Sequence, residues 1–196
     1  LLDGFGRKRM GRQAAGAVAR MDARLLDMLE HARHDDIVAV ALKYAPKGIA
    51  LFNAAIFIDS LRYKFTDHPK TQEIFSRLDG WAGSIGVPGL FGHAGVFSQY
   101  MIGSAELVAS ALLITGAFYA PYRFLLPLGA LLGLAVMTGA ISFHLFTPLG
   151  IDPNSDGGGL FRAACLVWVF SLALLFLRAD DLGLLGRRAG AFLQPA

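Results

Sequence analysis

Four long runs of apolar residues fill most of the last three quarters of this 196-residue chain. They cover about residues 48–65, 97–118, 124–146 and 160–177, lengths near the ~20 residues that an α-helix needs to cross a bilayer. Only 17% of the residues are charged and 55% are hydrophobic, whereas a soluble domain carries about a quarter charged residues. The sequence therefore predicts an all-α membrane protein built as a bundle of four transmembrane helices.

The basic residues beside these runs predict how the bundle is oriented. Basic residues concentrate on the cytoplasmic side of membrane proteins, and thirteen of the eighteen Lys and Arg residues fall on the side that holds both chain ends. An even number of crossings then places both termini in the cytoplasm. The first run is short for a crossing, so we expect it to borrow residues from 37–45 or to extend Arg62 and Lys64 toward the interface.

The first 36 residues follow a different pattern. Residues 1–12 hold three glycines and four basic residues without apolar periodicity, which is typical of a flexible arm or of a contact to another chain. Over residues 13–34, apolar side chains recur at helical spacing among charged ones, which predicts an amphipathic helix. It would lie on a membrane face, on a partner or on the chain's own bundle. We divide the chain into this basic arm and helix (1–36), a transmembrane domain (37–182) and a cytoplasmic tail (183–196).

The connection between the first two runs, residues 66–94, is long for so small a protein. Its first part, Pro69 to Leu78, predicts a short helix with proline in the first turn. The following segment is apolar and rich in glycine, so we expect it to fold back as a cap, with Trp81 and Phe91 as interfacial anchors. In contrast, the turn at 119–123 is tight, which predicts that the second and third spans are antiparallel neighbours.

A few polar side chains interrupt the apolar runs. An ionisable group inside a span costs about 2.5–3.5 kcal/mol on insertion scales, so each one calls for a partner or a role. With the predicted topology, most of these groups lie near the outer end of the bundle and Glu106 lies deeper. On the second span, Gln99, Gly103, Glu106 and Ser110 share one helix face, which predicts that this face points inward. The predicted polar pocket comprises Asp59, Arg62, Lys64, Gln99, Glu106, Ser110, His144 and Arg162.

Two interpretations of this set stay open. Asp59 and Arg62 are three residues apart and can pair along their own helix, which leaves Glu106 for Lys64, for Arg162 or for a water-filled cavity. These pairs either fix the register of the helices or line an outward-facing pocket for a small polar or quinone-like ligand.

Several classes of site are not expected. No second histidine lies in any span with His144, which disfavours haem, and the single Cys165 excludes a Cys-x-x-Cys metal or redox site. The basic residues flank apolar spans, where they serve topology and lipid contact rather than nucleic-acid binding. No sequence motif assigns a catalytic residue, so whether the chain is an enzyme stays open.

Five segments, met in order along the chain, carry a resemblance to a known family. They are Ser60–Thr66, Glu73–Phe75, Ile102–Ser110, Gly139–Phe146 and Asp156–Gly158. Together they resemble the DoxX-like family of bacterial four-helix membrane proteins, over about Leu42 to Arg178. The resemblance implies a four-helix bundle in the bacterial cytoplasmic (inner) membrane and an association with quinone-linked redox or respiratory assemblies. The matching positions Lys64, Glu106, His144 and Asp156 are functional candidates only.

These observations lead to two hypotheses. In the first, the chain is a redox-linked membrane subunit that binds quinone or a small acid; Glu106 and His144 handle protons, and Arg62 or Lys64 holds the anionic group. In the second, it is a non-catalytic accessory subunit of a larger membrane complex, docked through residues 1–36. Its partners would then be membrane lipid and other subunits or a second copy of the chain.

Overall fold

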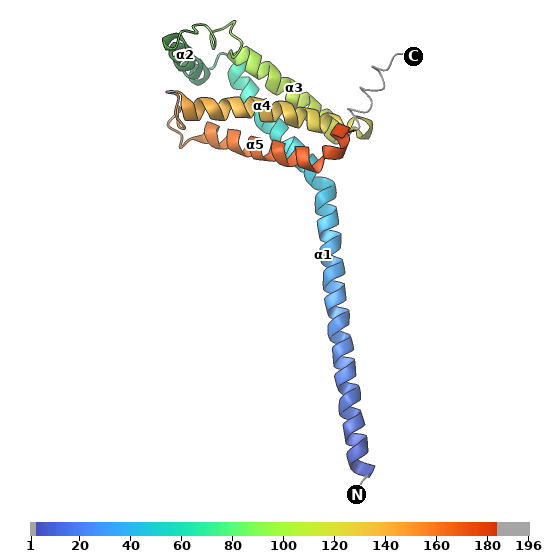
Figure 1. Cartoon of the computed structure of the whole chain (residues 1–196). Helices are drawn as coiled ribbons and strands as arrows, with labels where there is room; N and C mark the ends of the chain where they lie inside the picture. Colours follow the sequence, from blue (N-terminus) through green and yellow to red (C-terminus); the bar gives the residue numbers. More distant parts are fainter. Residues whose placement is uncertain (1–2, 184–196) are drawn as a thin grey trace, which may run out of the picture. The chain divides into compact units, whose positions relative to one another are not determined.

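The computed structural model describes residues 3–183, and within that range every regular element is helical (Figure 1). The elements are α1 (Asp3–Phe65), α2 (Pro69–Ser84), α3 (Gln99–Phe118), the short 3₁₀ helix η1 (Ala120–Tyr122), α4 (Leu125–Phe146) and α5 (Gly159–Leu177). The predicted all-α class is confirmed. The chain divides into two compact units, residues 1–44 and residues 45–196.

The first unit is helical from Asp3, where α1 begins. This differs from the flexible arm expected over residues 1–12. Three Arg, one Lys and one Met in residues 1–12 are strong helix formers, and each residue added to an existing helix gains one backbone hydrogen bond. Local propensity therefore offsets the glycines. At the other end of the chain, the expected cytoplasmic tail lies, after Gly183, outside the residues that the structure describes.

Four helical segments are long and apolar enough to cross a membrane, namely Asp36–Phe65, Gln99–Phe118, Leu125–Phe146 and Gly159–Leu177. The last three agree with the predicted spans to within two residues. The first begins at Asp36. It therefore includes residues 37–45, which was one of the two ways in which we expected the first span to reach its full length. Many large apolar side chains on these helices are exposed, including Leu131, Val169 and Phe176, and such contiguous apolar surface suits contact with lipid.

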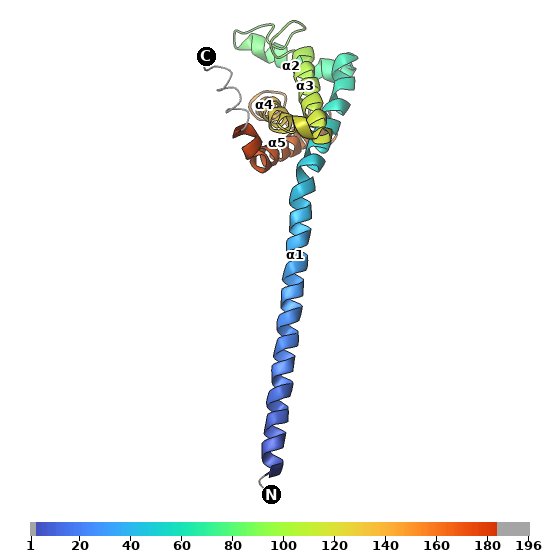
Figure 2. The same cartoon turned by 90° about the vertical axis from the view of Figure 1, so that its right-hand side faces the viewer.

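Small residues bring the helices of the second unit close together. A Cβ atom on Gly129 would lie 2.8 Å from Leu113 Cγ, and one on Gly133 would lie 3.1 Å from Phe57 Cζ. Two small residues four positions apart on α4 thus allow the close approach of its neighbours. The buried core between the helices includes Ala50, Ala54, Ala109, Ala130, Ala164, Val167 and Leu174. Figure 2 shows α4 and α5 side by side within this bundle.

A short turn joins α3 to α4. The Tyr119 N–H donates to Thr115 O at 2.9 Å and ends α3, and the Tyr122 N–H donates to Tyr119 O at 2.9 Å within η1. The chain reverses over these few residues, so α3 and α4 pack as antiparallel neighbours (Figure 1). That prediction is confirmed.

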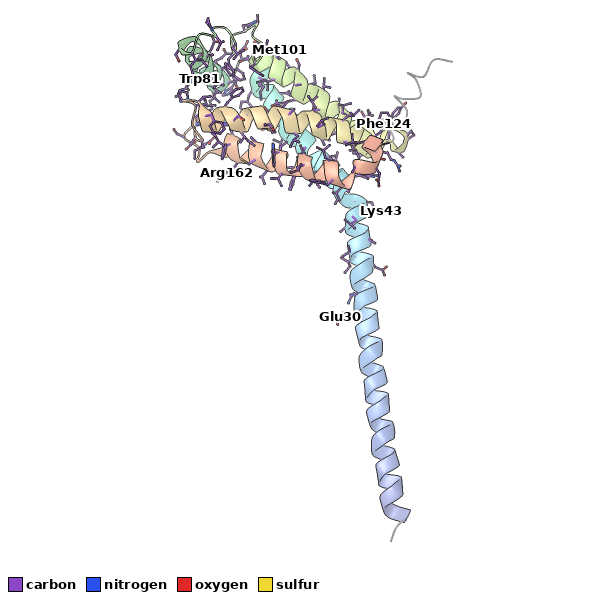
Figure 3. The ribbon with its side chains drawn as sticks, viewed as in Figure 1. Glu30, Lys43, Trp81, Met101, Phe124 and Arg162 are labelled. Atoms are coloured by element: carbon purple, nitrogen blue, oxygen red, sulfur yellow. The ribbon has the colours of Figure 1, made fainter. Side chains whose placement is uncertain are left out.

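The connection before α3 differs in part from the expectation. The helix that begins at Pro69 continues to Ser84, beyond the predicted end at Leu78. Phe91 is 2% exposed and its ring packs edge-on against Phe143 at 4.9 Å, so it belongs to a buried cluster and is not an interfacial anchor. In Figure 3, Trp81 lies at the same end of the bundle as Arg162, and Phe124 lies at the opposite end.

Candidate functional site

A buried ion pair joins α1 to α3. Lys64, in the last turn of α1, places Nζ 3.1 Å from Oε1 and 3.0 Å from Oε2 of Glu106. The Glu106 side chain is 3% exposed and that of Lys64 is 14% exposed. The ammonium also donates to Ser60 Oγ one turn earlier. Of the partners left open for Glu106, the structure therefore selects Lys64.

The glycine at position 103 makes this pair geometrically possible. A Cβ atom on Gly103 would lie 3.3 Å from Phe65 Cζ and 3.5 Å from Lys64 Cβ, so the missing side chain leaves room for the close approach of α1 to α3. Gln99, Gly103, Glu106 and Ser110 are all buried, as predicted for an inward face. Ser110 Oγ donates to the Glu106 backbone oxygen at 2.8 Å, so its hydroxyl is satisfied on its own helix.

His144 reaches the same region from the last turn of α4. Its Nδ1 lies 2.6 Å from Gly150 O, and because a carbonyl oxygen only accepts, Nδ1 carries the proton. In a neutral ring Nε2 is then an acceptor. The ring is buried and packs edge-on against Phe161 at 5.7 Å, which holds its orientation.

These groups meet at one cavity of about 430 Å³ at one end of the bundle. Asp59, Lys64, Glu106 and His144 line it, out of the eight predicted site residues. Much of the remaining wall is apolar and comes from α1, α4 and α5, including Phe57, Met137 and Leu160. Polar groups of the connections, Lys70 and Asp156, complete the lining. The cavity thus joins a polar end to an apolar body.

The other predicted residues lie elsewhere. Arg62 pairs with Asp59 at 3.0 Å, as predicted, but both side chains are more than half exposed and Arg62 does not line the cavity. Arg162 is exposed at the start of α5 and also lies outside the lining. Both arginines lie on exposed faces of their helices. The apolar period of a helix does not by itself show which face points toward the cavity. Gln99 lines a second cavity, described below.

Sequence reasoning missed a polar contact in the core, between Asn53 and Ser171. Asn53, on α1, is fully buried and its Nδ2 donates to Ser171 Oγ on α5 at 3.0 Å. The amide of Asn53 inside an apolar run could have indicated this contact, because a buried amide needs a hydrogen-bond partner. Lys70 was also missed, because its place depends on how α2 folds against the bundle.

In the loop before α5, the pKa of Asp152 is lowered. Backbone N–H groups of Gly158, Asp156 and Gly157 donate to the Asp152 carboxylate and hold its pKa below the ordinary value of 3.8. Two of these bonds measure 2.9 Å, from Asp156 N–H, and 3.2 Å, from Gly157 N–H. Hydrogen bonds to the charged form favour it, and here they shape the entry to α5.

Among residues 3–183, no group of three or more His, Cys, Asp or Glu side chains is arranged to hold a metal ion. Comparisons of the chain with protein-family models, with curated proteins and with solved structures found no match.

Proposed function

We propose that this chain is a DoxX-like multi-pass protein of the bacterial cytoplasmic membrane, and that its cavity binds a quinone as part of a redox or respiratory assembly. One observation carries the proposal: the Lys64–Glu106 pair and His144 share a cavity whose other walls are largely apolar. A volume of about 430 Å³ falls in the range of ligand sites, ~300–1,000 Å³.

The charges around the cavity favour a quinone over a small acid. Three carboxylates line it, those of Asp59, Glu106 and Asp156, against two ammonium groups, those of Lys64 and Lys70. Arg62 offsets Asp59 and Glu106 already holds Lys64, so the lining presents no net positive charge to a free carboxylate ligand. A quinone head is neutral, and its ring and tail suit the apolar wall.

The residues of this chain fit such a group. A bound quinone would supply two-electron redox chemistry coupled to two protons. Where the two Glu106 oxygens share one N–H of the Lys64 ammonium, an N–H is left to donate to a carbonyl oxygen. With Nδ1 on the Gly150 carbonyl, Nε2 of His144 is the nitrogen that can exchange a proton with a quinone oxygen. Glu106 holds the ammonium in position.

The proposed topology places the cavity at the outer face. In the opposite direction along the bundle, Arg123 lies 3.0 Å and Arg178 3.7 Å from carboxylate oxygens of Asp181, which supports a basic cytoplasmic end. A Cys165→Ser background with a single Ser155→Cys or Ala120→Cys change tests this with a membrane-impermeant maleimide on intact spheroplasts. Labelling of position 155 but not 120 is expected. The reverse pattern contradicts the topology.

Quinone binding is tested by titrating the purified full chain, in neutral detergent, with decylubiquinone. We expect saturable binding that weakens about tenfold in His144→Phe, the equivalent of one lost hydrogen bond of about 1.4 kcal/mol. Glu106→Gln should weaken it as well, because Lys64 then loses its fixed position. Glu73→Gln is the matched control, since Glu73 pairs with Arg77 outside the cavity. Equal binding by all four proteins rules out this site, and displacement by benzoate favours the small acid.

A second candidate function is that of a non-catalytic accessory subunit docked through residues 1–36, with another subunit or a second copy as partner. It is favoured by the division of the chain, since residues 1–44 form a compact unit of their own. In this candidate the amphipathic helix over residues 13–34 takes part in docking. The segment 66–94 is then a cap on the outer membrane interface and has no part in docking. Blue-native gels of membranes with residues 1–36 deleted test it. A complex of unchanged mass excludes docking through this region.

A further inference from the structure

A second cavity, of about 470 Å³, lies beside the end of α1, α2 and the start of α3. Its lining is more polar than that of the first cavity and includes two carboxylates, Asp67 and Asp79, together with His93 and Tyr100. It shares none of the Lys64, Glu106 and His144 side chains. In Figures 1 and 2, α2 lies near the first turns of α3, and residues of both helices line this cavity. We propose that it binds an organic ammonium group.

The Asp67 carboxylate is built into the cavity by several donors. Gln72 Nε2 donates to Asp67 Oδ1 at 3.0 Å, and Gln99 Nε2 and the Tyr100 hydroxyl donate to the same oxygen. Asp67 itself adopts a left-handed backbone conformation with φ of 52°, which is uncommon for a residue other than glycine. The turn between α1 and α2 thus holds this carboxylate at a fixed position.

A pair of amides, of which Gln99 is buried and Gln72 is exposed, supports that position. Gln99 is 5% exposed, and its Nε2 also donates to the Lys64 backbone oxygen at 2.9 Å. Gln72 Nε2 lies 2.9 Å from Gln99 Oε1. All of these donors are neutral. They orient the Asp67 carboxylate without cancelling its charge.

The second carboxylate is held in a similar way. Asp79 Oδ1 accepts the Phe91 N–H at 3.1 Å, which ties α2 to the segment before α3. Between residues 3 and 183, neither Asp67 nor Asp79 makes an ion pair within 4.0 Å, and no Lys or Arg lines the cavity. Two negative charges therefore face it, and a cationic ligand would neutralise them.

The residues that line the cavity indicate which kind of cation it would bind. Aromatic residues border the cavity, namely Phe75, Phe91, His93 and Tyr100, and the rings of His93 and Tyr100 lie 4.8 Å apart. A cation is attracted to the face of a phenyl or phenol ring, and carboxylates with aromatic walls are the recognition chemistry of alkylammonium groups. A bare metal ion would need a tight set of several oxygen ligands and would fill little of this volume. An organic ammonium group, free in solution or on a phospholipid headgroup, satisfies both charge and walls.

The test uses the purified full chain and isothermal titration with choline. We expect saturable binding of choline and none of 3,3-dimethylbutan-1-ol, its uncharged isostere. Dihexanoylphosphatidylcholine forms a second arm: binding of the lipid without free choline assigns the site to a headgroup, and binding of choline assigns it to a free amine. Either result supports the proposal. Equal binding of choline and its isostere, or no binding of choline or the lipid, overturns it.

Variants locate the binding. Asp79→Asn keeps an oxygen for the Phe91 N–H and removes the charge, so we expect choline or lipid binding to weaken at least tenfold while the unfolding temperature is kept. Asp67→Asn should weaken it as well. Glu73→Gln on the same helix removes an exposed carboxylate outside both cavities and should leave binding unchanged. Unchanged binding in Asp79→Asn and Asp67→Asn contradicts the assignment even if the wild type binds choline.

Discussion

Replacing Lys64 by methionine removes the ammonium and keeps a side chain of similar length. Glu106, 3% exposed, then carries a carboxylate in apolar surroundings without its cation. Within residues 3–183, Lys64 is the one Lys or Arg within 4.0 Å of that carboxylate. Breaking a buried ion pair from one side costs about 3–5 kcal/mol, and we expect Lys64→Met to lower the free energy of unfolding by that amount.

The reciprocal change is expected to cost less. In Glu106→Gln, the ammonium of Lys64 keeps Ser60 as an acceptor and, being 14% exposed, can extend toward water. A loss of about 1–2 kcal/mol follows for the missing charged hydrogen bonds. The double variant contains neither charge, so it should lie close to Glu106→Gln alone. The expected coupling between the two sites then equals the cost of Lys64→Met, about 3–5 kcal/mol.

The assay is unfolding in mixed micelles, followed by circular dichroism as sodium dodecyl sulfate is titrated near neutral pH. Arg77→Met is the matched control, because it breaks the Arg77–Glu73 pair, in which both side chains are about half exposed. Exposed pairs contribute less than about 1 kcal/mol. If Lys64→Met costs no more than this control, or if the two single changes simply add, the pair is not buried as described.

Three further predictions concern packing and the loop before α5. Gly129→Ala should lower the free energy of unfolding in micelles by about 1–3 kcal/mol, because the new Cβ atom would lie 2.8 Å from Leu113 Cγ. Gly48→Ala has open space around the new Cβ and should be neutral or stabilising by up to ~1 kcal/mol; similar losses for both would contradict this packing. Ser171→Ala leaves the buried amide of Asn53 without its acceptor and should cost about 1–3 kcal/mol in the same assay; an unchanged midpoint would show that the bond contributes nothing. The lowered pKa of Asp152 means that its contribution to stability is present above the ordinary pKa of 3.8 and is lost as pH falls through the depressed value. Thermal unfolding between about pH 6 and pH 3 should therefore depend less on pH in Asp152→Asn than in the wild type, and identical pH profiles would refute the assignment.

Hydropathy identified the helical segments of the second unit because that signal is local. The bounds of α3, α4 and α5 depend on runs of apolar residues and on nearby turn residues, so prediction and structure agree to within two residues. The same approach predicted a flexible arm over residues 1–12, where the chain is helical from Asp3. It weighed the glycines above the helix formers around them.

The candidate site could be predicted in part. The inward face of α3 follows from its 3.6-residue period, and the Asp59–Arg62 pair follows from spacing along one helix. Which cation meets Glu106 depends on how closely two helices approach, and Gly103 lies at that approach. Periodicity carries no information about that approach. Hence Arg62 and Arg162 were predicted beside the cavity although neither lines it.

The sequence by itself determined that four helices of membrane-crossing length form, because apolar length and low charge are properties of consecutive residues. Only the tertiary structure decided that Lys64 pairs with Glu106, that His144 Nδ1 meets the Gly150 carbonyl and that Phe91 is buried. Each of these outcomes requires residues far apart in the chain to meet at distances of a few ångströms. Such contacts arise from the packing of whole helices and loops, which no single segment encodes.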